Sequence, residues 1–271
     1  MATTSSALAT YLQDGLMDRL FHATPTFTQP TASALHLALF STVPTADTGA
    51  GATELTYTGY AREVIDFTAA SGRAVSQNGV ITFGQNTGAD QTAVAWGVYD
   101  ALSGGNLLAF GDINPDKLIG TNNTPSIADG SIVLTFTAGN VSDYLANLFL
   151  DYAFNDGVDP STITPYAWLS TTEYVTSGDG SSLTEPADTY VRPTADAWTV
   201  TANSAVNTNE IAFATPGASW GVITAVGLAS SVTTNAGEVL FFDNAPTGDG
   251  QTPTTGDTVA IPATTFAASV S

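Results

Sequence analysis

Hydrophobic residues follow a helical spacing in two stretches of the chain. The first stretch, from Leu8 to Leu20, has leucines at every fourth position and predicts a helix that begins near Ser6 as its N-cap. The second, from Tyr144 to Tyr152, carries a stripe of leucine and aromatic residues, and either Ser142 or Asp143 can serve as its N-cap. Each stripe is typical of a helix that docks one apolar face on a sheet.

Short extended runs, separated by glycine, asparagine, aspartate and proline, follow each helical stretch. They cover residues 35–40, 63–67, 79–83, 93–99, 106–110 and 131–137 in the first half, and residues 166–169, 198–201, 210–213, 220–228, 238–242 and 258–261 in the second. Helical spacing is confined to the start of each half, so we do not expect alternating strands and helices around a parallel sheet. The pattern predicts a mainly β protein with sandwich-like or barrel-like domains, each preceded by an N-terminal α-helix.

The two halves repeat one another. Tyr60-Ala61-Arg62 returns as Tyr190-Val191-Arg192, and Ile81-Thr82-Phe83 returns as Ile211-Ala212-Phe213, each about 130 residues later. This separation is far longer than the period of a solenoid and indicates duplication of a whole domain. We therefore predict two tandem homologous domains, residues 1–138 and 139–271, with the second diverged from the first.

The amino-acid composition limits the kinds of molecule that the protein can bind. Among 271 residues, 25 are acidic and only five are basic, which gives a formal net charge of −20 at pH 7. Such a surface repels nucleic acid and anionic membranes, so we expect neither as a partner. The chain contains no cysteine, which excludes disulfides and thiolate metal sites. Its first ten residues lack the basic start and apolar run of a signal peptide, so we expect a soluble product.

The scarce arginines are the most informative polar residues. In an extended strand, residues four apart face the same side, so Arg62 can reach Asp66 and Arg192 can reach Asp196. We predict these as structural charge pairs that stabilise each domain, with partner binding as the alternative. Pro193 weakens the strand assignment in the second copy.

One segment has the form of a hydrolase motif. Residues 217–221 read Gly-Ala-Ser-Trp-Gly, but a triad on this pattern needs a histidine later in the chain, and both His22 and His36 precede Ser219. We interpret the segment as a turn. We predict no catalytic, cofactor-binding or metal-binding residues and no cofactor, although calcium binding stays open at three Asp-Gly turns, which begin at Asp129, Asp179 and Asp249.

The order of these blocks resembles a family of small tailed-phage virion proteins, described as tail fibre or head decoration proteins. The resemblance rests on the first-repeat segments 38–45 (Ala-Leu-Phe-Ser-Thr-Val-Pro-Thr), 60–62 (Tyr-Ala-Arg), 81–83 (Ile-Thr-Phe) and 103–108 (Ser-Gly-Gly-Asn-Leu-Leu). It implies a structural role without an active site, with two family units in tandem. The second copy has lost the Pro-Thr ending and the Ser-Gly-Gly turn, so its surface contacts are expected to differ.

These observations lead to one main functional hypothesis. We expect a non-enzymatic structural protein on the virion exterior of a tailed bacteriophage, synthesised in the host cytoplasm, that decorates or cements the capsid. The favoured partner is the major capsid protein, and the chain is expected to be a homo-oligomer such as a trimer. The nearest alternative is a tail fibre or baseplate component that binds tail proteins. More remote alternatives are a carbohydrate-binding or adhesive module with exposed aromatics, and a polysaccharide hydrolase with paired carboxylates in a cleft.

Overall fold

The described residues form a mainly antiparallel β fold with two α-helices, as the sequence predicts. The structure is a computed structural model that describes residues 3–22, 27–44, 50–137, 139–201, 203–244 and 250–270. The backbone packs into two compact units. Unit 1 comprises Met1–Gly15, Phe27–Phe136 and Leu148–Val158, and unit 2 comprises Leu16–Thr26, Thr137–Asn147 and Asp159–Ser271. The predicted boundary at residue 138 lies outside the described residues.

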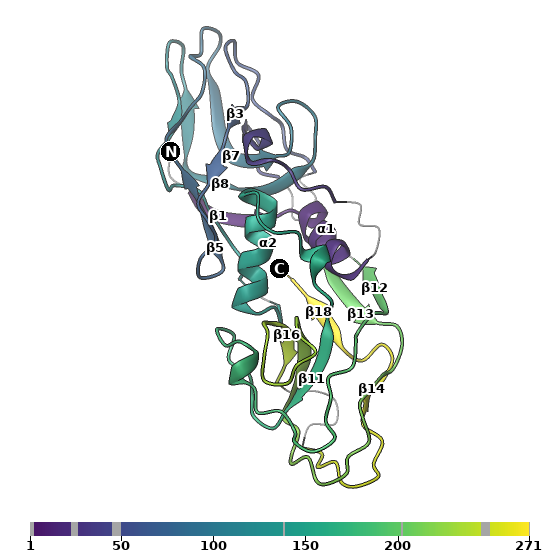
Figure 1. Ribbon diagram of the computed structural model, residues 1–271. Helices are drawn as coiled ribbons and strands as arrows, with labels where there is room; N and C mark the ends of the chain where they lie inside the picture. The colour runs from purple at the N-terminus through teal and green to yellow at the C-terminus, as the bar shows by residue number, and fades with distance from the viewer. Residues whose placement is uncertain are drawn as a thin grey trace. The chain divides into compact units, whose positions relative to one another are not determined.

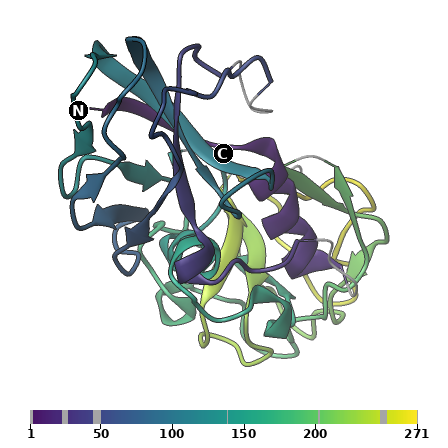
Figure 2. The same cartoon turned by 90° about the horizontal axis from the view of Figure 1, so that it is seen from above.

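Unit 1 is built around a five-stranded antiparallel sheet (Figure 1). Its strand order is β1 (Thr3–Leu8), β8 (Leu107–Ile119), β7 (Gln91–Tyr99), β2 (His36–Phe40) and β3 (Glu63–Val64). Viewed from above, the purple strand β1 runs beside the long blue-green strand β8 (Figure 2). A second sheet has the order β10 (Val133–Thr135), β5 (Ala74–Asn78) and β4 (Asp66–Phe67), and β6 (Ile81–Thr82) pairs with β9 (Ser126–Ile127).

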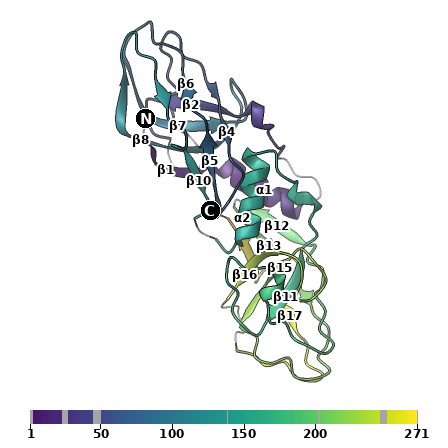
Figure 3. The ribbon, with the colours of Figure 1, turned by 60° about the vertical axis from the view of Figure 1, so that its left-hand side comes forward.

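Unit 2 repeats this plan with shorter strands. Its first sheet, labelled in Figure 3, has the order β11 (Tyr166–Ser170), β15 (Ala225–Ala229) and β16 (Val239–Asp243), which corresponds to β2, β7 and β8 of unit 1. The second sheet has the order β12 (Trp198–Thr201), β13 (Ser204–Asn207) and β18 (Ala267–Ser269). A two-stranded ladder joins β14 (Ile211–Ala212) to β17 (Ala260–Ile261), and both sheets are antiparallel.

The two helices begin differently from one another. Helix α2 (Asp143–Phe154) is capped by Ser142, whose Oγ accepts a hydrogen bond of 3.2 Å from the Leu145 N–H. Helix α1 (Thr10–Phe21) begins later than predicted, so the expected cap at Ser6 was wrong. Residues 3–8 instead form β1, in which Leu8 pairs with Ala109 of β8. Neither α-helix in the described part of the chain has the length and apolar run needed to cross a bilayer.

Each helix contributes to both units. The first turns of α1 belong to unit 1 and the part from Leu16 onward belongs to unit 2, while α2 belongs to unit 1 from Leu148 onward. Each unit therefore contains helical residues that come from the other sequence repeat.

In each unit, one aromatic side chain packs over a glycine of the central strand, but the aromatic residue comes from a different strand position in the two units. In unit 1, the Phe40 ring covers Gly97, and a Cβ added to that glycine would lie 2.7 Å from the ring. In unit 2, Trp168 covers the equivalent Gly227, where an added Cβ would lie 2.4 Å from the indole. Phe40 and Trp168 are both buried, and they lie two residues apart when the strands are aligned. The corresponding small residues are Ala38 in β2 and Ser170 in β11.

A short clasp joins the start of the second repeat to the last strand of unit 2. The Asn140 side chain donates to the Ala267 carbonyl at 2.7 Å and accepts from the Ser269 N–H at 2.8 Å. Gly139 forms an isolated bridge with Val270. These bonds fix both ends of the repeat at one place in unit 2.

An ion pair within unit 2 should make the free energy of unfolding decrease as the pH becomes acidic. The Arg19 guanidinium donates to both carboxylate oxygens of Asp159, and the Nε–Oδ1 distance is 2.8 Å. This contact lowers the pKa of Asp159 to about 2. A depressed folded-state pKa contributes stability above the unfolded-state pKa of about 3.9 and loses it as pH falls toward the folded value.

The Asp159→Asn variant should therefore lose part of this stability near neutral pH and show a weaker fall in stability between pH 4 and pH 2. Urea denaturation across that range measures the effect, and Arg19→Met should reduce the pH dependence in the same way. An unchanged slope in both variants would contradict the assignment.

Candidate functional site: a repeated arginine latch

The arginine of the Tyr-x-Arg motif in the first repeat binds a glutamate and a loop. Arg62 Nε and Nη2 donate to the two carboxylate oxygens of Glu54, at 3.0 and 2.9 Å. Its Nη1 donates to the carbonyl oxygens of Ala101 and Gly104, at 2.9 and 2.8 Å. The guanidinium also lies against the Tyr99 ring, 3.6 Å from its centroid. Parallel bonds of this kind fix the geometry of the pair as well as its charge.

The second repeat forms the same arrangement. Arg192 donates to both oxygens of Glu185, each at 2.8 Å, and its Nη1 donates to the carbonyls of Ser231 and Ala236 at 2.8 and 2.9 Å. The side chains of Arg192 and Glu185 are completely buried. The Arg62 and Glu54 side chains are 8% and 30% exposed, so the first copy is more accessible to water.

The tyrosine of the motif connects each pair to the central sheet. The Tyr60 hydroxyl accepts from the Leu39 N–H at 3.0 Å and donates to the glutamate at 2.9 Å. Tyr190 accepts from the Leu169 N–H at 2.8 Å and donates to its own glutamate at 2.9 Å. Burial raises the pKa of both phenols, so the hydroxyls keep their protons as donors. We call each arginine, glutamate and tyrosine set a latch.

The predicted aspartate partners lie elsewhere. Arg62 pairs with Glu54 rather than with Asp66, and Arg192 pairs with Glu185 rather than with Asp196. Both aspartates are exposed. The prediction assumed one continuous strand, but at Ile65 the chain passes from β3, which pairs with β2, to β4, which pairs with β5.

The second-repeat segment around Arg192 also departs from a regular strand. Thr194 forms only an isolated bridge, and the next strand, β12, begins at Trp198. Arg192 and Asp196 therefore do not share the strand geometry that the spacing of four assumed.

The glutamates were missed because they lie outside the repeated Tyr-x-Arg blocks. A usable signal does exist: a Thr-Glu dipeptide precedes the motif tyrosine in both repeats, with Glu54 six residues before Tyr60 and Glu185 five residues before Tyr190. A buried arginine needs a carboxylate as its counterion. Glu54 and Glu185 stand at nearly the same sequence separation from the motif in the two repeats and so could have been proposed as the partners.

Each latch holds a loop that exposes an aliphatic side chain. The carbonyls bound by Arg62 lie on either side of Leu102, which is 57% exposed. The carbonyls bound by Arg192 lie on either side of Val232, which is 49% exposed. We call residues 100–106 and 230–236 the latched loops. The arginine fixes the base of each loop and leaves its tip in solvent.

The second loop keeps this arrangement without the Ser-Gly-Gly sequence. In the first loop, Gly104 and Gly105 have φ values of 64° and 73°. In the second repeat, Asn235 and Gly237 supply the positive φ values, 52° and 73°. The Asn235 N–H also donates to the latch glutamate, so the diverged sequence is tied to the same anchor.

The other residues considered for chemistry have local structural partners. Ser219 is exposed in the loop between β14 and β15. The Nδ1 atom of His22 contacts the Asp18 carboxylate, and that of His36 lies 2.7 Å from the Ala34 carbonyl oxygen. Within the described ranges, no three histidine or carboxylate side chains are grouped so that they could hold a metal ion.

Two of the three Asp-Gly turns use their carboxylates to bind backbone. Asp129 accepts from the Gly79 N–H at 2.7 Å, and Asp179 accepts from the Ser181 N–H at 2.9 Å. The third, at Asp249, lies outside the described residues.

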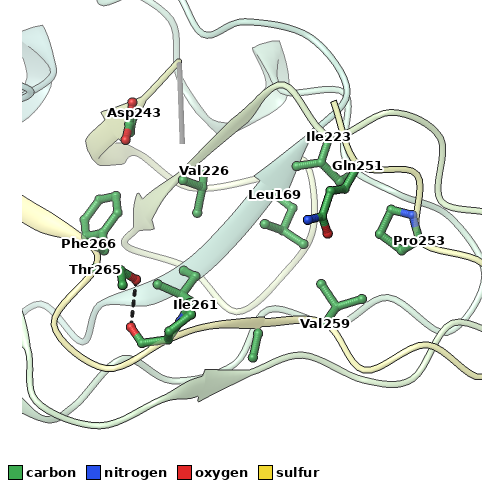
Figure 4. A pocket seen from close by; sticks show the side chains of 12 residues that line it. Leu169, Ile223, Val226, Asp243, Gln251, Pro253, Val259, Ile261, Thr265 and Phe266 are labelled. Carbon is green, nitrogen blue, oxygen red and sulfur yellow. Dashed lines mark hydrogen bonds between the residues drawn. The ribbon is translucent and has the colours of Figure 1, made fainter. Parts of the chain in front are cut away.

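A small pocket opens in unit 2 (Figure 4). It has a volume of about 100 Å³, and most of its lining is apolar, including Leu169, Ile223 and Ile261. Asp243 is the one carboxylate among the lining residues, all of which are described. Cleavage of a glycosidic bond by the usual mechanism uses two carboxyl groups, which this pocket does not offer.

The chain is a protein of two duplicated β modules, and in each module the arginine latch joins a loop to the central sheet. Comparison with protein families identifies the module. The model of the family described as podophage GP4 fiber I protein gp80 matches residues 7–135 and again residues 140–269. The chain therefore belongs to this family and carries two copies of its unit, which confirms the resemblance to phage virion proteins. No curated protein matches the chain.

Membership of a phage fibre family supports a structural role in the virion and a location on its exterior. It favours the tail fibre alternative over capsid decoration, which was the leading expectation.

Proposed function

We propose that the chain is a non-enzymatic component of a podophage tail fibre and that it contacts other virion proteins through its latched loops. The observation that carries the proposal is the double match to a fibre family, which covers nearly the whole chain.

The position on the particle is tested by labelling intact virions and counting copies. Antibody against the protein should decorate the tail, and quantitative mass spectrometry should find far fewer copies than of the major capsid protein. Copies in simple proportion to the capsid protein, with label over the head, would overturn the fibre assignment in favour of capsid decoration. Cleavage of a polysaccharide by the purified protein would overturn the non-enzymatic role.

Charge and exposure indicate the kind of partner that the latched loops fit. Arg19, Arg62 and Arg192 form ion pairs with carboxylates of the chain itself, which leaves a strongly acidic surface on a chain of net charge −20. Leu102 and Val232 are exposed aliphatic side chains on loops whose bases are hydrogen-bonded to the latch arginines. We propose that the loops insert into apolar recesses with basic rims on a neighbouring virion protein.

Replacing both loop tips, Leu102→Ser and Val232→Ser, should reduce incorporation of the protein into particles by about tenfold or more, because a buried anchor dominates such contacts. Quantitative immunoblotting of purified virions measures the effect. The folded chain should keep its thermal stability, since both side chains are exposed. Val80→Ser, at a side chain that is 66% exposed, is the matched control. Equal incorporation of the double variant and the parent would exclude the loops as contact sites.

A further inference from the structure

The two sequence repeats contact one another inside the units, because each unit contains a helix segment that comes from the other repeat. Unit 1 contains Leu148–Val158 of the second repeat, and unit 2 contains Leu16–Thr26 of the first. The two exchanged segments occupy nearly equivalent positions in their repeats. Such reciprocity is typical of an exchange between two copies of one module.

The last residue of each helix shows the exchange most clearly. Phe21 of α1 packs on Trp198 of the second repeat, with ring centroids 4.6 Å apart. Phe154 of α2 packs on Phe67 of the first repeat, at 5.2 Å. Trp198 and Phe67 occupy nearly equivalent positions at the start of the second sheet, so the same aromatic contact is made twice in opposite directions.

Further contacts anchor both exchanged segments. In unit 1, Tyr152 packs on Phe27 at 5.9 Å, and Asp151 accepts a 2.7 Å hydrogen bond from the Ala70 N–H. Phe149, Tyr152 and Phe154 are no more than 1% exposed. In unit 2, Phe21 also stacks on Phe241, at 5.8 Å. These are core contacts, so each exchanged segment completes the interior of the unit in which it lies.

We propose that the partner each repeat requires is a second copy of the same module, and that the exchanged helices hold the two repeats together without the covalent connection between them. The chain is then equivalent to a dimer of two modules that are joined into one polypeptide. The connection raises the effective concentration of the two halves but adds no essential contact.

The test cuts the connection in the folded, full-length protein. A protease recognition sequence inserted after Thr137 allows cleavage into two fragments, and the clasp at Asn140 stays entirely within the second fragment. After complete cleavage, the fragments should elute together in size-exclusion chromatography at the volume of the uncut protein. Separation of the fragments under native conditions would overturn the proposal.

A substitution at the exchange contact identifies what holds the fragments. Phe154→Ala should weaken their association by about a hundredfold or more, because it removes a buried aromatic ring. Val158→Ala, at a residue that is 68% exposed near the end of the same segment, is the matched control and should leave association unchanged. Equal association of the parent and the Phe154 variant would show that the exchange does not hold the fragments.

A second measurement needs no substitution. The urea midpoint of the cleaved protein should rise with protein concentration, because folding then requires two fragments to associate. The uncut protein should show no such dependence. A midpoint that is independent of concentration after cleavage would also contradict the exchange.

Discussion

Replacing Arg192 with methionine should lower the free energy of unfolding by about 3 to 5 kcal/mol, because it leaves the completely buried Glu185 without its counterion. Methionine retains much of the apolar volume of the arginine stem, so the effect reports mainly on the charge and the four hydrogen bonds. Urea denaturation followed by circular dichroism measures it. Amide exchange at Asn235, whose N–H binds the same glutamate, should become faster.

The first latch supplies the control. Arg62→Met should cost less than Arg192→Met, because the Glu54 side chain is 30% exposed and water can solvate its carboxylate. Replacing both members of the second latch, Arg192→Met with Glu185→Leu, should recover part of the loss, because no buried charge then remains unpaired. Equal costs for the two arginine variants would contradict the role assigned to burial.

Replacing Trp168 with alanine should lower the free energy of unfolding by about 3 to 5 kcal/mol, since the indole fills the space above Gly227. The first repeat shows how the loss can be reduced. There an alanine, Ala38, occupies the equivalent position, and Phe40, two residues further along the strand, covers the glycine. Adding Ser170→Phe to Trp168→Ala should therefore restore part of the stability.

A double-mutant cycle shows whether the two substitutions compensate for one another or whether their stability losses simply add. Ser170→Phe alone should destabilise the protein by about 1 to 3 kcal/mol, because Trp168 already fills the site. The two substitutions should therefore show a favourable coupling energy. Additive costs would mean that the two repeats do not share the same core geometry at this glycine.

The regular elements were predictable where apolar spacing defines them. The run at residues 198–201 coincides with β12, and the stripe from Tyr144 to Tyr152 lies within α2. Strand β1 was missed because its sequence, Thr-Thr-Ser-Ser-Ala-Leu, has no apolar alternation, and its pairing with β8 fixes its conformation. The polar strands β5, β9 and β13 were missed for the same reason.

The latch was only half predictable. Repetition identified the arginines and tyrosines, because a scarce residue at the same place in two copies indicates a shared structural role. The partner was assigned from strand geometry, which fails where a chain changes sheets, as it does at Ile65. The exchange of helices could not be predicted, since similar apolar stripes fit the sheet of either repeat equally well.

The clasp has a mechanical consequence for a protein that belongs to a fibre family. Gly139 and Val270 are bridged to one another, so tension applied at these two residues acts on adjacent points. A force that pulls these two residues apart would break the hydrogen bonds of the clasp one after another and not all at once. The clasp should then open at lower force than the sheet of β11, β15 and β16, while the exchanged helix segments keep the two repeats together.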